Sequence, residues 1–172
     1  MPSFQDTEPL LFADLGPRKV LADFSGGTLS SDGGSLLLRQ IDRGLGLTRQ
    51  LATCFVDARD QRWVDHSLGQ LLAQRVYAIA LGYEDLNDHE LLRRDPLFAA
   101  ACEKTDPTGQ DRILPQFRNA ALAAPATLNR FELSNDKKSR AHKLAHDPAK
   151  VEACLLEMGS RCLPKHATEL VL

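Results

Sequence analysis

The chain has 172 residues, enough for one domain with a hydrophobic core or for two small ones. Its composition, 43% hydrophobic and 26% charged, is ordinary for a globular protein, and its net charge of −2 excludes a chain that is basic throughout. The longest apolar stretch, at residues 76–83, is too short to span a bilayer, and the N-terminus shows no signal-peptide pattern. We therefore expect a cytoplasmic protein with free thiols.

The N-terminal stretch changes character near residue 19. Residues 1–18 contain prolines and no periodicity, so we expect an irregular arm there. The following segment, KVLADFSGGTLSS at 19–31, alternates in polarity, and its Gly26–Gly27 pair can supply the positive φ of a tight turn. This pattern predicts a short β-hairpin near residues 19–31.

Apolar residues recur at helical spacing through most of the remaining chain. The pattern predicts helices at 31–46, 47–55, 68–81, 85–104, 124–134 and 147–159, with loop-like structure at 105–124. Ser67 is a good N-cap for the helix at 68–81, which we expect to be the central buried one, and Pro96 forces a bend or a break in the helix at 85–104. With a strand-like end at 168–172, the predicted fold class is mainly α.

An acidic cluster lies in ALGYEDLNDH, residues 80–89. Asp85 and Asp88 could share a helix face as an acid/base pair or as metal ligands. A calcium loop counted from Asp85 fails, because Pro96 stands where the final glutamate is needed. The favoured interpretation is structural: Asp85, Asn87 or Asp88 caps the next helix.

Two further motifs are weighed in the same way. The glycine-rich stretch at 26–35 precedes a helix but lacks the ending of a phosphate-binding P-loop, so turn and capping chemistry is the better interpretation. His142, His146 and Cys162 could contribute to a zinc site, although their spacing matches no common zinc motif. We expect no metal site in this chain.

Basic residues gather between Arg130 and Lys150, where six basic and three acidic side chains give a local charge of +3. A short helix carrying types that can reach base edges precedes this run. A solvated surface is the commoner fate of such a run, and DNA contact is the alternative. The candidate DNA-binding residues are Thr127, Asn129, Arg130, Lys137, Lys138, Arg140 and Lys143.

Three blocks in this order, GTLSSDGGSLLLRQIDRGLGL, HSLGQLLAQRVYAIALGYEDLNDHELLRRDP and PATLNRFE, resemble a known family. They are similar to the N-terminal region of bacterial insertion-sequence transposases of the transposase DDE domain group 1 family. The resemblance extends from about residue 19 to the end of the chain and is weakest at 105–124.

The resemblance implies an enzyme whose ribonuclease-H-like core holds divalent metal ions, such as Mg²⁺, with three carboxylates. In the family, the first of these carboxylates follows an apolar run like ELVL, which here ends at Leu172. No catalytic residue can therefore be assigned, and we expect this chain alone to be inactive. The expected domains are an arm at 1–18, a helical region at 19–164 and the start of the DDE domain at 165–172.

The function implied by the resemblance is DNA transposition, with this part binding the terminal inverted repeats of the transposon. Self-association or pairing with a full-length transposase is a further implied contact, and no membrane is implied. Two alternatives stay open: a truncated transposase that represses transposition by occupying transposon ends, and a gene remnant without function.

Overall fold

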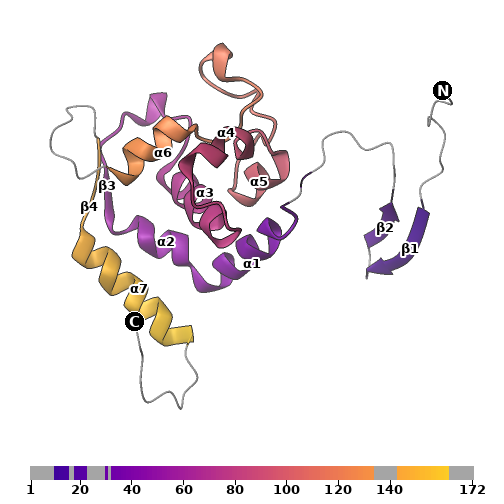
Figure 1. The fold of residues 1–172 in the computed structure, drawn as a ribbon, viewed down its shortest axis with the longest axis horizontal. Helices are drawn as coiled ribbons and strands as arrows, with labels where there is room; N and C mark the ends of the chain where they lie inside the picture. The colour runs from indigo at the N-terminus through magenta and orange to yellow at the C-terminus, as the bar shows by residue number, and fades with distance from the viewer. Residues whose placement is uncertain (1–9, 16–17, 23–29, 31, 134–142, 163–172) are drawn as a thin grey trace. The chain divides into compact units, whose positions relative to one another are not determined.

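A computed structural model describes residues 10–15, 18–22, 30, 32–133 and 143–162. The chain divides into two compact units, residues 1–31 and 32–172. In the first unit, β1 (Leu10–Leu15) pairs with β2 (Arg18–Ala22) as an antiparallel hairpin, with Leu10 opposite Ala22. Figure 1 shows both strands in indigo.

The hairpin lies earlier than the sequence pattern predicted. Residues 18–22 pair with the preceding segment, so residues 10–15 form a strand where an irregular arm was expected. The apolar run at 10–12 has the residue types that favour strands, and the prolines around it obscured this signal. The Gly26–Gly27 turn and the strand expected at 168–172 lie outside the described residues.

The second unit confirms a mainly α fold (Figure 1). Its α-helices among the described residues are α1 (Ser35–Leu45), α2 (Leu47–Ala52), α3 (Leu68–Ala80), α4 (His89–Leu92), α5 (Pro96–Ala101), α6 (Pro125–Glu132) and α7 (Pro148–Cys162). Short 3₁₀ turns occur at Gln61–Trp63, Leu86–Asp88 and Pro115–Phe117. The predicted break at Pro96 is confirmed, because Asp95 caps α5 by accepting from the backbone N–H groups of Leu97 and Phe98.

The central helix α3 starts and packs as expected. Ser67 forms a capping box with Gln70: its hydroxyl accepts from the Gln70 N–H, and its own N–H donates to the Gln70 side chain. The buried residues of α3 are Leu71, Leu72, Ala73, Gln74, Tyr77 and Ala78. Ile79, near the end of this helix, is apolar but 49% exposed.

Helical spacing and burial disagree on two helices. On α1, Leu37 and Ile41 recur at helical spacing but are 69% and 57% exposed, whereas Ser35 is fully buried. On α7 Met158 is buried, but Leu155 is 49% exposed, and the helix runs past Gly159 to Cys162. Helical spacing shows that residues share a face, but tertiary packing decides how much of that face is covered.

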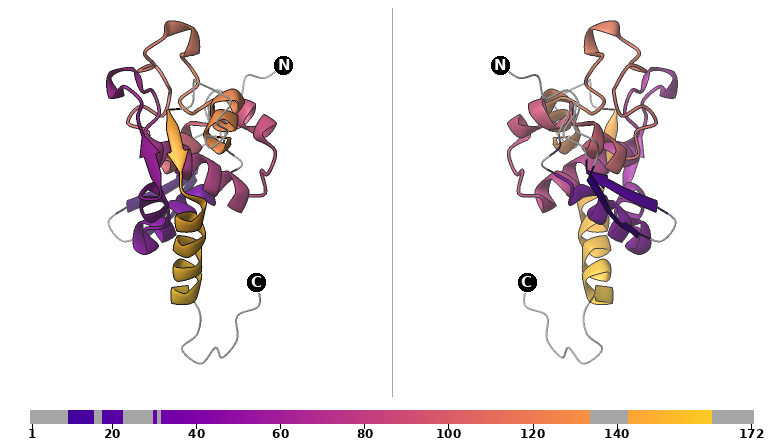
Figure 2. Two further views of the ribbon diagram at one scale, coloured as in Figure 1. Left: turned by 90° about the vertical axis from the view of Figure 1, so that its left-hand side faces the viewer. Right: turned by 90° about the vertical axis from the view of Figure 1, so that its right-hand side faces the viewer.

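Two short strands were missed at the sequence level. β3 (Phe55–Asp57) pairs antiparallel with β4 (Leu144–His146), and Figure 2 shows β4 leading directly into α7. A three-residue strand is too short to show alternation, so its pairing is not visible in the sequence. This pairing brings the chain around residue 58 beside residue 143.

Candidate nucleic-acid interface

The β3–β4 pair places two basic residues side by side. Beyond the last paired residues, the Ala58 N–H donates to the Lys143 carbonyl oxygen at 2.8 Å. Arg59 follows at once and donates from Nε and Nη2 to the Asp57 carboxylate at 2.8 and 2.7 Å. The hydrogen bonds from Arg59 lower the pKa of Asp57, so this carboxylate stays ionised and fixes the guanidinium.

Helix α6 supplies a third basic residue. Leu128 and Phe131 are buried and hold α6 against the core. Arg130 is exposed, and its Nε and Nη2 donate to the Ala126 carbonyl at 3.1 Å and the Thr127 hydroxyl at 3.4 Å. Within the described part of the chain, Arg130 and Lys143 have no carboxylate within ion-pair distance.

These residues line a cavity of about 640 Å³, which we term the cationic cleft. Its lining residues are Arg59, Asp60, Trp63, Val64, Asp65, His66, Arg93, Arg112, Phe117, Ala124, Ala126, Thr127, Arg130 and Lys143. Five basic side chains thus face two acidic ones. A second cavity of about 210 Å³ shares Arg59, Thr127, Arg130 and Lys143 with it.

Three of the seven predicted DNA-binding residues meet in the cationic cleft: Thr127, Arg130 and Lys143. Asn129 is exposed on α6 and lines neither of these two cavities. Lys137, Lys138 and Arg140 lie outside the described residues. Whether any of the seven binds DNA stays a prediction.

Sequence reasoning missed Arg59, Arg93 and Arg112. Arg59 and Arg93 form ion pairs with Asp57 and Glu90, which lie two and three residues away. Such neighbours cancel the local charge, so a count of basic runs does not detect these arginines. A signal was nevertheless present in DARDQRW at 57–63, which joins arginines to the one tryptophan of the chain.

His66 and Arg112 form the inner end of the cationic cleft. His66 is 5% exposed, and its Nε2 pairs with Nη1 of Arg112. Burial, and then the positive charge of Arg112, lowers the pKa of His66 to about 3. His66 is therefore neutral at physiological pH, and its Nε2 accepts the proton that Arg112 donates.

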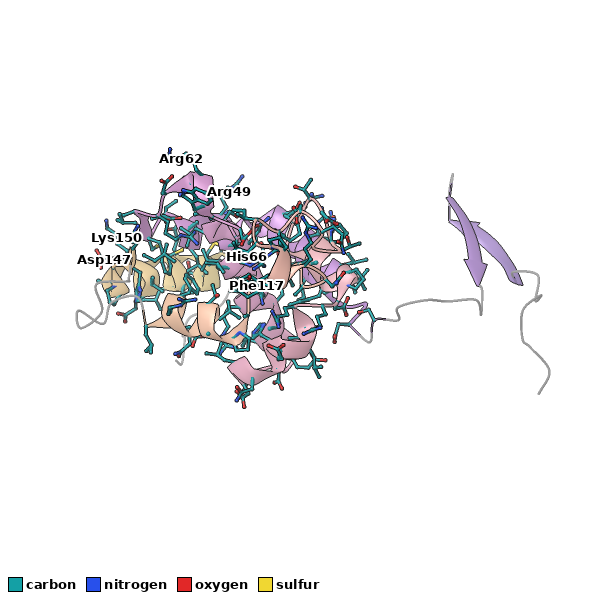
Figure 3. All side chains as sticks on the ribbon, turned by 90° about the horizontal axis from the view of Figure 1, so that it is seen from above. Arg49, Arg62, His66, Phe117, Asp147 and Lys150 are labelled. Carbon is teal, nitrogen blue, oxygen red and sulfur yellow. The ribbon has the colours of Figure 1, made fainter. Side chains whose placement is uncertain are left out.

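Two aromatic side chains accompany the cations. Trp63 is 72% exposed, and Phe117 is 39% exposed with the Arg112 guanidinium carbon 5.6 Å from its ring centroid. Figure 3 labels His66 and Phe117 close together within the helical unit, and both line the cationic cleft. Guanidinium groups beside accessible rings suit phosphates and stacked bases. The cleft thus has the chemistry of an anion-binding surface of the nucleic-acid type.

The profile described as transposase DDE domain group 1 matches residues 12–172. The chain belongs to this family, whose members act on DNA in transposition and generally depend on divalent metal ions. Comparisons with curated proteins and with solved structures gave no significant match. Among the described helices, none is long and apolar enough to cross a membrane.

The described residues do not fit the metal site of the family. They contain no group of three or more His, Cys, Asp or Glu side chains placed to hold a metal ion. Asp85 caps the 3₁₀ turn at Leu86–Asp88 by accepting from the Asn87 N–H at 2.9 Å, which confirms the structural interpretation of the acidic cluster. Of the zinc candidates, His146 packs against the Phe55 ring, Cys162 is exposed, and His142 lies outside the described residues.

Proposed function

We propose that this chain binds the terminal inverted repeats of its transposon through the cationic cleft. The observation that supports the proposal most is the convergence of Arg59, Arg130 and Lys143 from three separate segments on one cavity. Arg130 and Lys143 are exposed, and among the described residues neither has a carboxylate partner, so their charges are available to phosphates.

The charge balance supports a polyanion such as DNA as the ligand. The chain as a whole carries −2, so a cleft with an excess of basic side chains creates a local field opposite to that of the rest of the molecule. Such a local field directs a polyanion to one face. Thr127, whose hydroxyl lies beside Arg130, adds a group that can read or position a nucleotide.

The test is the salt dependence of binding to transposon-end DNA, measured by fluorescence anisotropy with the full chain. The double variant R130A/K143A should lower the magnitude of the slope of log K against log salt by about 2, because each lost phosphate contact removes about 0.9. The matched control is K150A/R161A, which removes two exposed basic residues of α7 that do not line the cationic cleft.

Equal slopes for the cleft variant, the control and the unmodified protein would exclude the cationic cleft as the DNA site. The triple variant K137A/K138A/R140A tests the predicted basic run separately. Recognition of the inverted repeat requires a further comparison with scrambled DNA of the same length. Equal affinity for both would leave general DNA binding in place and reject recognition of the repeat.

A further inference from the structure

The inner end of the cationic cleft contains polar groups whose hydrogen-bonding capacity is unused. Nε of Arg93, Nε of Arg112 and Nδ1 of His66 are buried and have no hydrogen-bond partner among the described residues. All three side chains line the cationic cleft. Buried polar groups are almost always paired in folded proteins, so three such groups around one cavity indicate a ligand that pairs with part of this cluster.

The two arginines present further donors to this region. Arg93 uses Nη2 for Glu90, and Arg112 uses Nη1 for His66 and for the carbonyl oxygens of Ala120 and Leu122. Nη1 of Arg93 and Nη2 of Arg112 have no partner within the described part of the chain. Planar guanidinium groups with free N–H donors match the oxygens of a phosphate.

The charge at this end is also incompletely balanced. Asp65 lies 3.6 Å from Nε of Arg112, and Glu90 pairs with Arg93 from the exposed side. Burial is the main cause that lowers the pKa of Arg112; the charge of Asp65 opposes this shift, and the positive charge of Arg93 adds to it. An anion between these two guanidinium groups would relieve their mutual repulsion.

The depth of these donors decides which form of DNA can reach them. The side chains of Arg93 and Arg112 are only 14% and 9% exposed. A duplex is stiff and carries its phosphates on its outside, so these reach exposed side chains such as Lys143 more readily than recessed ones. A recessed donor is reached by a group that enters the cavity, and 640 Å³ lies within the range of about 300–1,000 Å³ typical of small-ligand sites.

We propose that the inner end of the cationic cleft binds one unpaired nucleotide, with its phosphate between Arg93 and Arg112 and its base against Phe117 or Trp63. This inference rests on the proposed function, since it names the form of DNA that the cleft takes. A single-stranded end and a nucleotide extruded from a duplex supply the same chemistry. Phe117 and Trp63 offer accessible rings for stacking, which tolerates any base.

Trp63 provides the test, because it is the one tryptophan in the chain. The full chain is titrated with a single strand of about eight nucleotides, a duplex with an overhang, a duplex with one base opposite an abasic site, and a blunt duplex. If the site binds a strand end, the single strand and the duplex with an overhang should quench tryptophan emission. If it binds an extruded base, the duplex with the abasic site should quench it. The blunt duplex should quench it far less in both cases.

Arg93 and Arg94 form a matched pair of variants. Both contact Glu90, but only Arg93 lines the cationic cleft. R93Q should weaken binding of unpaired DNA about tenfold, the loss expected for a hydrogen bond to a charged group, whereas R94Q should not. R93Q should lose less affinity for the blunt duplex than for unpaired DNA, whereas R94Q should change neither affinity by more than about twofold. If R93Q does not fold, as judged by circular dichroism, F117L replaces it and should reduce the preference for unpaired DNA.

The outcomes separate this inference from the proposed function. Equal affinity for blunt and unpaired DNA, with equal quenching, would overturn the unpaired-nucleotide site and leave DNA binding intact. Equal behaviour of R93Q and R94Q would also overturn it. Failure to bind any of the DNAs would overturn both proposals.

Discussion

Gln74 and Ala123 form a double hydrogen bond in the core of the helical unit. Nε2 of Gln74 donates to the Ala123 carbonyl at 2.9 Å, and the Ala123 N–H donates to Oε1 of Gln74 at 2.9 Å. Gln74 is 1% exposed and Ala123 is 0% exposed. The Gln74 side chain therefore supplies hydrogen-bond partners to a buried backbone segment that would otherwise lack them. It also fixes the start of α6, which carries Thr127 and Arg130.

Replacing Gln74 with leucine should destabilise the protein strongly. Leucine fills a similar volume but leaves the Ala123 N–H and C=O unpaired in the core, at a cost of about 1–3 kcal/mol for each group. Urea unfolding monitored by circular dichroism measures the free energy of unfolding. Q40A, at an exposed position on α1, serves as the control and should change it by less than about 0.5 kcal/mol. A Q74L variant as stable as the control would show that the pair contributes little.

Alanine substitutions at Gly109 and Gly82 distinguish the cost of a steric clash from the cost of backbone strain. Both glycines have positive φ, 72° and 93°. A Cβ at Gly109 would lie 2.6 Å from the Ala121 backbone nitrogen, whereas a Cβ at Gly82 would meet nothing within 4 Å. G82A should cost about 1 kcal/mol for the left-handed conformation alone. G109A should cost clearly more, because the buried segment at 120–123 would have to move.

The comparison is made by thermal unfolding of the two alanine variants under one set of conditions. A larger drop in Tm for G109A than for G82A is the expected result. Equal drops would mean that the backbone near Ala121 can shift without cost, and that Gly109 is not held tightly against the buried segment at 120–123.

The two buried histidines should make stability depend on pH. Burial is the main cause that lowers the pKa of His66 to about 3 and that of His89 to about 4. In the unfolded chain histidine titrates near pH 6.5, so below about pH 6.5 the unfolded state binds more protons than the folded state. The stability that comes from keeping the two histidines neutral is therefore fully present above this pH. It is lost as the pH falls toward the folded-state pKa values.

Between the folded-state pKa values and about pH 6.5, the free energy of unfolding should fall with decreasing pH by about 1.4 kcal/mol per pH unit for each histidine. Urea unfolding at pH values from about 7 to 4.5 measures it, before protonation of carboxylates such as Asp57 adds to the loss. H89N is compared with the unmodified protein over the same range. Its overall stability can differ, but its slope should be smaller, and an unchanged slope would contradict the assignment of His89 as a neutral buried group.

Asp42 joins α1, α2 and α3 through hydrogen bonds. Its carboxylate accepts from the Tyr77 hydroxyl at 2.8 Å and from the Thr48 N–H at 2.9 Å. A double-mutant cycle of Y77F and D42N should give a coupling energy of about 1 kcal/mol or more. Thermal denaturation of the four proteins supplies the values. A coupling energy near zero would show that Tyr77 is held by apolar packing alone.

The sequence predicts the helical elements well because their signals are local. Ser67 and Asp95 mark helix starts by side-chain chemistry, and Pro96 and Pro125 mark first turns. The β3–β4 pairing joins residues far apart in the chain, and nothing local to Phe55–Asp57 identifies its partner. The segment at 120–123 was expected to be a simple loop. Its burial depends on Gln74, so sequence spacing could not reveal it.

The candidate site likewise contains residues that the sequence indicates and residues that only the fold brings together. Thr127, Arg130 and Lys143 belong to a basic run that is visible in the sequence, and the structure brings them to one cavity. Arg93 and Arg112 come from segments that carry no charge excess, and only the fold places them beside His66. Convergence of side chains from distant segments is a tertiary property, which periodicity and charge counting do not measure.

The β3–β4 pairing has a thermodynamic consequence. The bond from Ala58 to Lys143 closes a loop of most of the helical unit, so Arg59 and Lys143 become neighbours only once that unit has folded. The dense positive field of the cationic cleft is thus a property of the native state, whereas in the unfolded chain the same charges are dispersed. A polyanion that binds the cleft is therefore linked to the folding equilibrium. It raises the free energy of unfolding by RT ln(1 + [L]/Kd), so DNA bound in the cleft, as proposed, would also stabilise the folded protein.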